Sequence, residues 1–214
     1  MSLTAEAKAI VDEYGDDPVP MGVLKKRAKD IKVNHALGLE LWSTGKYFVQ
    51  MLGALILDKK QIDLATIEGF ADELVDRDDF EMNRLSEWLL ANQLMKDKRL
   101  SALIDEWEKH ENAVLHRLFW YKQARLRWTG QTPPDNTGYL MDQIEANFMD
   151  EVPMVQWTMN FCAGQIGIFD APFRKRCIKL GEKTQYMIDE KVPANCVPSY
   201  LPLFIAHGVS KQAA

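Results

Sequence analysis

Residues 22–57 contain three short amphipathic segments in close succession, and they constrain the fold more than any other part of the chain. Apolar residues recur at helical spacing within each segment. In the third segment these residues are Phe48, Met51, Leu52, Leu55 and Ile56. The breaks between the segments are short, at Val33-Asn34 and at Ser43-Thr44-Gly45. None of these helices can bury its apolar face alone, so we expect them to stack on neighbouring helices, as in an α-solenoid.

The rest of the sequence continues this helical pattern and contains no convincing strand. Helical spacing is seen at 3–14, 64–74, 80–95, 100–107, 114–128, 140–148, 153–166 and 173–180. Asp63 is the expected N-cap of one helix, and Pro153 is expected in the first turn of another. Successive helices begin about 15–20 residues apart, close to half a HEAT repeat. The sequence therefore predicts an all-α protein, an α-α superhelix (HEAT-like repeat solenoid) of about eleven helices.

The 214 residues are expected to form one domain, spanning residues 1–214. The strongest loop signal is TGQTPPDNTG at residues 129–138, which we interpret as an internal loop. Residues 190–214 form a proline-rich tail that is expected to be irregular. Apolar residues in this tail indicate that it packs back on the helices.

Several features predict a cytoplasmic protein with no membrane segment. No apolar stretch is long enough to cross a bilayer, and the acidic N-terminus MSLTAEAKAIVDEYGDD lacks the apolar core of a signal peptide. The three cysteines form no CxxC motif, and an odd, sparse count is typical of a reducing compartment.

The sequence predicts no metal site and no cofactor. The four histidines have no carboxylate or cysteine partners at ligand spacing. Walker A, GxGxxG and GxSxG motifs are absent from the sequence. Cys162 falls on the apolar side of a helix and is expected in the core.

The distribution of charge says more about binding than the net charge of −5. Basic residues concentrate at 25–32, 96–99, 117–127 and 174–183. One helix combines the bases Arg117, Lys122, Arg125 and Arg127 with the aromatics Phe119, Trp120, Tyr121 and Trp128. Bases interleaved with aromatics can hold phosphates and stack on nucleotides. The plainer alternative is a solvated helix face with a core on its other side.

A second cluster, at Asp76, Asp78, Asp79, Phe80 and Glu81, comes directly before a helix. Carboxylates at a helix N-terminus are favoured by capping and by the helix dipole. The functional alternative is that one carboxylate faces a substrate and stabilises developing positive charge.

The stretch MGVLKKRAKDIKVNHALGLELWSTGKYFVQMLGALILDKKQID resembles the N-terminal half of the DNA alkylation repair (AlkD-like) proteins. Those proteins share the basic helix after Gly-Val, the His-x-Leu-x-x-x-Leu-Trp run and the helix after a glycine turn. NAVLHRLFWYKQARLRW is similar to the helix that carries a paired-arginine motif, and VQWTMNFCAGQIG is similar to a later helix. The resemblance covers roughly residues 20–170.

This resemblance implies a HEAT-like solenoid whose concave basic face holds double-stranded DNA. Family members with glycosylase activity release cationic alkylpurines such as 3-methyladenine and 7-methylguanine. Two tryptophans and an aspartate contact the DNA backbone around the lesion, and the carboxylate stabilises the oxocarbenium-like sugar.

This chain departs from the family pattern at those positions. Phe80 stands where the first tryptophan is expected, Arg84 where the aspartate is expected, and Phe161 at the second tryptophan. The paired arginine becomes His116-Arg117. Asp78, Asp79 or Glu81 would then be the substitute catalytic carboxylate, and a cation at Arg84 argues for DNA binding without excision.

Three hypotheses follow from these residues and the resemblance. The protein is a glycosylase for alkylated purines, a non-catalytic binder of bent or branched DNA, or a protein-binding HEAT scaffold. Under the DNA hypotheses, the expected contacts are Phe80, Arg84, His116, Arg117, Lys122, Arg125 and Phe161. The expected partner is double-stranded DNA, alkylated or branched, and the protein is expected to act as a monomer.

Replacing Arg117 with alanine is the mutational test that the sequence alone suggests. If Arg117 contacts a phosphate, Arg117→Ala should weaken DNA affinity and lower the slope of log Kd against log salt by about one. A salt titration of DNA binding measures this slope. An unchanged slope would remove Arg117 from the interface.

Overall fold

The computed structural model describes residues 3–15 and 18–212. These residues form twelve α-helices and four short 3-10 helices, and no strand occurs among them. The predicted all-α fold is therefore confirmed, with one helix more than the eleven expected. The chain divides into two compact units, Met1–Trp107 and Glu108–Ala214.

The first unit contains seven α-helices. They are α1 (Ala5–Tyr14), α2 (Met21–Ile31), α3 (His35–Trp42), α4 (Tyr47–Ile56), α5 (Leu64–Val75), α6 (Asp79–Asn92) and α7 (Lys98–Ile104). Asp63 caps α5 as predicted, because its carboxylate accepts a hydrogen bond from the Thr66 amide at 2.9 Å. Asn34 caps α3 in the same way.

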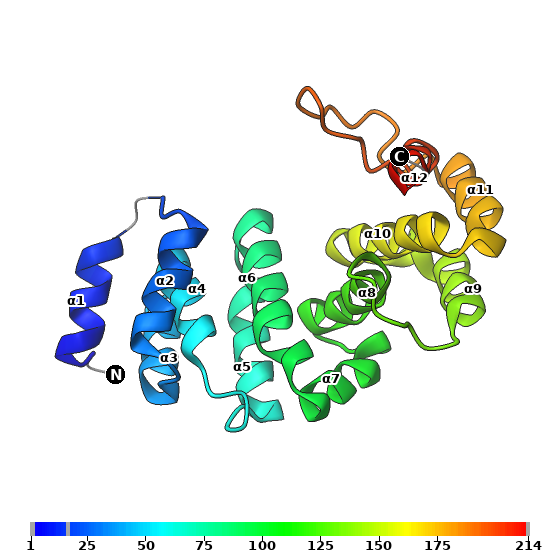
Figure 1. The fold of residues 1–214 in the computed structure, drawn as a ribbon. Helices are drawn as coiled ribbons and strands as arrows, with labels where there is room; N and C mark the ends of the chain where they lie inside the picture. Colours follow the sequence, from blue (N-terminus) through cyan, green and yellow to red (C-terminus); the bar gives the residue numbers. More distant parts are fainter. Residues whose placement is uncertain (1–2, 16–17, 213–214) are drawn as a thin grey trace. The chain divides into compact units, whose positions relative to one another are not determined.

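Helices of the first unit lie in two rows (Figure 1). Within one row α2 packs on α4 and α4 packs on α6, while α3 packs on α4 and α5 on α6 from the other row. Leu24, Leu52 and Leu85 from the first row are fully buried. The helices predicted as too short to be stable alone thus share one core, in the paired arrangement of HEAT-like repeats.

Two glycines let α3 and α4 approach very closely. A Cβ atom on Gly53 of α4 would lie 2.8 Å from the Gly38 carbonyl oxygen of α3, closer than real Cβ atoms come. The same Cβ atom would lie 3.2 Å from the Trp42 amide nitrogen. The position of Trp42 therefore depends on the absence of a side chain at Gly53.

The second unit contains five α-helices. They are α8 (Ala113–Trp128), α9 (Thr137–Asn147), α10 (Pro153–Phe169), α11 (Arg174–Thr184) and α12 (Leu201–Gln212). Pro153 begins α10, as the sequence predicted. α8 and α10 pack along each other, and α10 also contacts α9, α11 and α12. Cys162 of α10 is fully buried, which confirms its predicted place in the core.

The prediction of an irregular tail over residues 190–214 is wrong for its second half, where α12 forms. Pro202 lies in the first turn of α12, where its missing N–H costs no helical hydrogen bond. Leu201 and Ile205 of α12 are buried, so the tail does pack back on the helices as expected.

The boundary between the two units falls between Trp107 and Glu108, which was not anticipated from the sequence. The loop at 129–138, interpreted as internal, lies inside the second unit. The single domain expected over residues 1–214 stays a prediction. No helix among the described residues is both long and apolar enough to span a membrane.

Gly53→Ala should destabilise the protein by about 1–3 kcal/mol, because the added methyl group must push α3 away from α4. Thermal or urea unfolding measures the change. Gly22→Ala in α2 is the matched control, since a Cβ atom there meets no other atom within 4 Å. The control should be neutral or slightly stabilising. Equal effects of the two changes would contradict the close packing at Gly53.

Candidate nucleic-acid interface

The predicted acidic cluster forms the start of α6, and its three candidate carboxylates have different surroundings. Asp78 is the N-cap, and its Oδ1 accepts hydrogen bonds from the amides of Phe80 and Glu81 at 2.9 and 3.1 Å. Glu81 pairs with Arg77 at 2.7 Å. Asp79 is exposed and has no hydrogen bond or ion pair among the described residues. Capping, the structural alternative considered for this cluster, thus accounts for Asp78.

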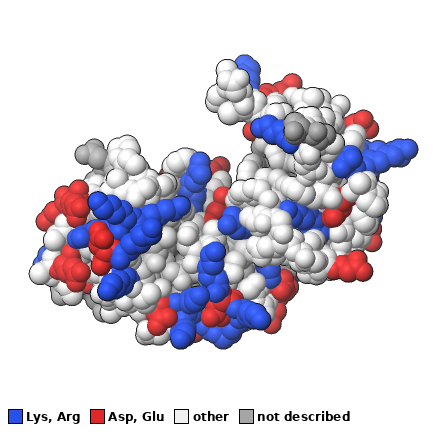
Figure 2. All heavy atoms as spheres, viewed as in Figure 1, with Lys and Arg blue, Asp and Glu red and all other residues white. Residues whose placement is uncertain are grey.

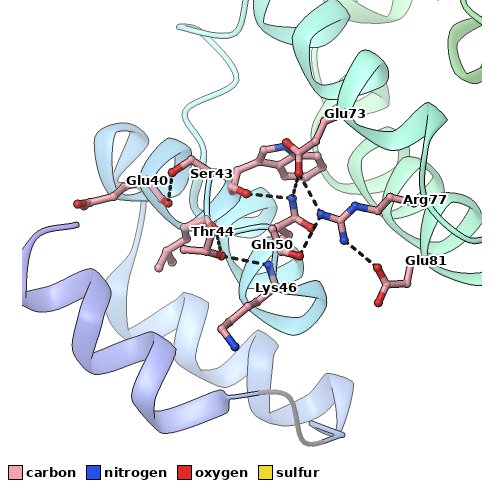
Figure 3. Close-up of polar contacts among 11 residues, drawn as sticks. Glu40, Ser43, Thr44, Lys46, Gln50, Glu73, Arg77 and Glu81 are labelled. Carbon is pink, nitrogen blue, oxygen red and sulfur yellow. Dashed lines mark hydrogen bonds and ion pairs between the residues drawn. The ribbon is translucent and has the colours of Figure 1, made fainter. Parts of the chain in front are cut away.

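Arg77 belongs to a polar network that ties the start of α6 to α3, α4 and α5 (Figure 3). Glu73 of α5 accepts hydrogen bonds from Trp42 Nε1 at 2.8 Å, Gln50 Nε2 at 2.6 Å and Arg77 Nη2 at 3.0 Å. Arg77 also donates to the Gly45 carbonyl at 3.0 Å. Trp42 and Gln50 are buried, so the network fixes the turn between α3 and α4 against the loop before α6.

Phe80, Arg84 and Trp88 lie four residues apart on α6 and therefore share one face of this helix. Phe80 is 62 % exposed, and the Arg84 guanidinium lies 5.7 Å from its ring centre. The ammonium of Lys25, from α2, lies 5.3 Å from the Trp88 ring. We call Phe80, Arg84, Trp88 and Lys25 the α6 strip. It alternates aromatic surface with positive charge, the combination that favours nucleic acid.

A cavity of about 490 Å³ lies beside Phe80. Tyr47 and Phe48 at the start of α4 line it together with Phe80, and Lys46 and Glu81 are also in its wall. The Tyr47 ring centre lies 5.9 Å from that of Phe80 and 4.8 Å from that of Phe48. Burial raises the pKa of Tyr47, and the carboxylates of Glu81 and Asp78 raise it further while Arg84 lowers it. The phenol therefore stays protonated.

Exposed bases of the first unit lie on α2 and around the start of α7, where Lys96, Lys98 and Arg99 are exposed. Lys25, Lys26 and Lys29 are exposed, whereas Arg27 is half-buried and lies 3.7 Å from Glu13. Figure 2 shows this group of Lys and Arg side chains over α2. The basic run at 25–32 is therefore a solvent-facing surface, as a phosphate-binding role requires.

The basic residues of α8 are mostly buried, which neither sequence interpretation anticipated. His116, Arg117, Lys122 and Arg127 are less than 9 % exposed, whereas Arg125 is partly exposed. The Arg117 guanidinium lies 5.9 Å from the Tyr121 ring. Burial counts against a direct phosphate contact by Arg117 or Lys122, although their roles stay predictions. Among the basic residues of α8, Arg125 is the one whose side chain is partly exposed to solvent.

Other arginines of the second unit hold its own helices together. Arg127 donates to Asp170 Oδ2 and to the Thr137 hydroxyl, both at 2.8 Å. Arg174 donates to the carbonyls of Gly167 and Ile168. Arg176 pairs with Asp142 and Glu145. Within the run at 174–183 the two arginines are therefore engaged, whereas Lys175, Lys179 and Lys183 are exposed to solvent.

Phe161 lies in an aromatic cluster on the second unit. Its ring stacks on Tyr121 and on Trp157, with centres 5.6 and 5.5 Å apart. Trp128 meets both Phe161 and Tyr121 edge-on and is 47 % exposed. The Arg125 guanidinium lies 5.3 Å from the Trp128 ring. Arg125 and Trp128 therefore form an exposed basic-aromatic pair over this stack.

His116 lines a different cavity, of about 430 Å³, at the start of α8. Its Nε2 accepts a hydrogen bond from Trp120 Nε1 at 3.1 Å, so the proton of the neutral ring lies on Nδ1. Nδ1 faces Glu151 Oε2 at 3.8 Å. Burial lowers the pKa of His116, the Glu108 charge partly offsets this, and burial raises the pKa of Glu151. Both shifts favour the neutral forms.

The described residues contain no group of three His, Cys, Asp or Glu side chains that could hold a metal ion. Burial raises the pKa of the thiols of Cys162 and Cys177 to about 12. Neither thiol is therefore a nucleophile at neutral pH.

The two rows of paired helices define a HEAT-like helical repeat protein. A solved structure described as that of "a new family of proteins related to the HEAT-like repeat DNA glycosylases with affinity for branched DNA structures" superposes with a TM-score of 0.67. The match covers 99% of this chain and 89% of that chain, at 17% sequence identity. At 17% sequence identity, this match shows that the two chains share a fold, and it shows no more than that.

The sequence itself matches the family model described as DNA alkylation repair enzyme over residues 18–187. The chain therefore belongs to the DNA alkylation repair enzyme family, which confirms the resemblance noted in the sequence. A comparison with curated proteins gave no significant match.

The predicted site residues fall into two groups, one in each unit. Asp78, Asp79, Phe80, Glu81 and Arg84 lie together at the start of α6. His116, Arg117, Lys122 and Arg125 lie on α8, and Phe161 lies on α10. Their roles in DNA binding or catalysis stay predictions.

Sequence reasoning missed Glu73, Arg77, Tyr47 and Trp88. The four-residue spacing of Glu73, Arg77 and Glu81 was a readable sign of the ion pairs. Trp88 likewise follows Phe80 and Arg84 at that spacing, which signals a common helix face. No local signal placed Tyr47 next to Phe80, because their contact depends on the packing of α4 against α6.

His116 should titrate below its ordinary pKa of 6.5, because burial disfavours the imidazolium. NMR titration of the imidazole measures this pKa, and a value of 6.5 or more would contradict the buried neutral ring. Glu108→Gln should lower the pKa further, since it removes a charge that favours protonation. The contribution of His116 to stability is then complete above pH 6.5 and is lost as the pH falls through the folded-state pKa.

Proposed function

We propose that the protein is a cytoplasmic monomer that binds branched double-stranded DNA without excising a base. The α6 strip is the observation that carries this proposal. Phe80 and Trp88 provide aromatic surface, and Arg84 and Lys25 provide positive charge beside it. The exposed lysines of α2 and the Arg125–Trp128 pair of the second unit supply further contacts of the same chemistry.

The charges at the start of α6 argue against excision of alkylated bases. Cleavage of the glycosidic bond needs an available carboxylate beside a sugar that becomes cationic. Glu81 is paired with Arg77, and Asp78 is engaged by two backbone amides. Arg84 places a cation over Phe80, where it would repel both the alkylated base and the sugar.

Branched DNA is the preferred substrate in this proposal for two reasons. The structurally similar family is described as having affinity for branched DNA structures, although it shares only 17% identity with this chain. In addition, a branch point exposes base faces that a continuous duplex hides, and exposed aromatics such as Phe80 and Trp128 stack on such faces.

A glycosylase for 3-methyladenine and 7-methylguanine is the second candidate, and Asp79 is the observation that favours it. Among the three candidate carboxylates, Asp79 is exposed and has no partner among the described residues, and it is adjacent to Phe80 in sequence. The third hypothesis, a protein-binding HEAT scaffold, has the net charge of −5 in its favour.

Arg84→Ala should weaken binding to a four-way junction and lower its salt slope by about one, because one phosphate contact is lost. Fluorescence anisotropy at several salt concentrations measures both quantities. Arg176→Ala is the control, since Arg176 is engaged by Asp142 and Glu145 within the second unit. An equal loss in both variants would point to a general charge effect, and binding no tighter than to linear duplex would refute the proposal.

Base release from methylated duplex DNA, at excess protein, decides between binding and excision. The proposal expects release at the spontaneous rate for both 7-methylguanine and 3-methyladenine. Faster release that Asp79→Asn abolishes would establish the glycosylase instead. Faster release that survives this change would exclude Asp79 as the catalytic carboxylate.

A further inference from the structure

The cavity beside Phe80 has the size and lining of a small-ligand site. Its volume of about 490 Å³ lies within the range of ordinary ligand pockets. Three aromatic rings, those of Tyr47, Phe48 and Phe80, contribute to its wall. Phe80 is 62 % exposed, so its ring is accessible to a ligand in the cavity.

Hydrogen bonds at the start of α6 fix the position of Phe80. Asp78 caps α6 through the amide of Phe80 itself, which fixes the backbone from which the ring projects. Arg77 holds the next turn through Glu81 and donates to the Gly45 carbonyl in the turn between α3 and α4. The cavity walls contributed by α4 and α6 are therefore connected by hydrogen bonds, so the site is preformed.

Polar groups surround the aromatic walls in a pattern that suits a flat heterocycle. The Tyr47 hydroxyl stays protonated, so it can both donate and accept a hydrogen bond. Glu81 can offer Oε1 as an acceptor, because its ion pair with Arg77 is made through Oε2, and the backbone N-terminus of α4 adjoins the same cavity without a side-chain cap. Aromatic faces with donors and acceptors at the rim are how proteins hold unstacked nucleobases.

The α6 strip leads along the helix from this cavity. Arg84 and Lys25 lie beside Phe80 and Trp88, so a DNA backbone along the strip would meet positive charge while one nucleotide reaches Phe80. We propose that the cavity lined by Tyr47, Phe48 and Phe80 binds one unpaired nucleobase at a DNA branch point. This inference rests on the proposed function and adds what the protein recognises at the branch.

The test compares two three-way DNA junctions that differ by one base. Both carry one unpaired nucleotide at the branch, an adenine in the first and an abasic residue in the second. Fluorescence anisotropy gives the Kd of each. The full chain should bind the adenine junction about tenfold more tightly, since base–aromatic stacking has this magnitude. Phe80→Ala should bind both junctions equally, with the affinity of the unaltered protein for the abasic junction.

Two variants complete the comparison. Phe80→Trp keeps an aromatic face and should retain the preference for adenine. Phe169→Ala removes a phenyl ring that is 43% exposed at the end of α10, and it should also retain the preference. The side chains of Phe80 and Phe169 are both exposed, so we expect each variant to fold. Circular dichroism tests whether it does.

The outcomes separate this inference from the proposed function. Equal binding of both junctions by the unaltered protein, with both tighter than linear duplex, would refute the base site and leave branched-DNA binding intact. A preference for adenine that survives Phe80→Ala would also refute the site. Binding no tighter than to linear duplex, for either junction, would refute the proposed function and the inference together.

Discussion

The hydrogen bonds to Glu73 are the interaction on which the candidate site depends. This carboxylate joins Trp42 at the end of α3, Gln50 within α4 and Arg77 before α6. Hydrogen bonds to a charged group are stronger than neutral ones, and removing the acceptor would leave the indole N–H of the buried Trp42 without its partner, whereas Gln50 Nε2 would keep its bond to the Trp42 carbonyl. Through Arg77, the same network fixes the position of Glu81 and so the orientation of the first turn of α6, which carries Phe80.

The ion pairs of Arg77 with Glu73 and Glu81 also illustrate why the number of basic residues alone does not predict a DNA-binding surface. A base contributes to DNA binding only if its charge is not already neutralised by a neighbouring acid. Arg127 and Arg176 are committed to Asp170, Asp142 and Glu145 within the second unit. Exposed bases remain on α2 (Lys25, Lys26 and Lys29), around the start of α7 (Lys96, Lys98 and Arg99) and on α11 (Lys175, Lys179 and Lys183), so the bases that DNA could reach are mostly lysines.

Much of the fold could be predicted from sequence because helix ends carry local signals. Asp63 and Pro153 mark helix starts, and each works through its own backbone neighbourhood. α12 was missed because the proline-rich tail was expected to be irregular, whereas Pro202 lies in the first turn of a helix, where proline is tolerated.

The site was harder to predict than the fold. The burial of α8 on nearly every side could not be inferred, because its bases and aromatics are interleaved and only tertiary packing decides which are covered. The contact between Tyr47 and Phe80 likewise joins residues that are distant in sequence.

The late position of α12 has a consequence for how the protein is made. Gly164 and Gly167 of α10 and Gly181 of α11 lie against Leu201, Phe204 and neighbouring residues of α12, which are synthesised after α10 and α11. Until then this glycine-lined surface has no cover. Domains generally fold from the N-terminus during synthesis, so the first unit can complete its core before α12 has been added to the second unit. Chaperones that bind exposed apolar surface would therefore meet the second unit rather than the first.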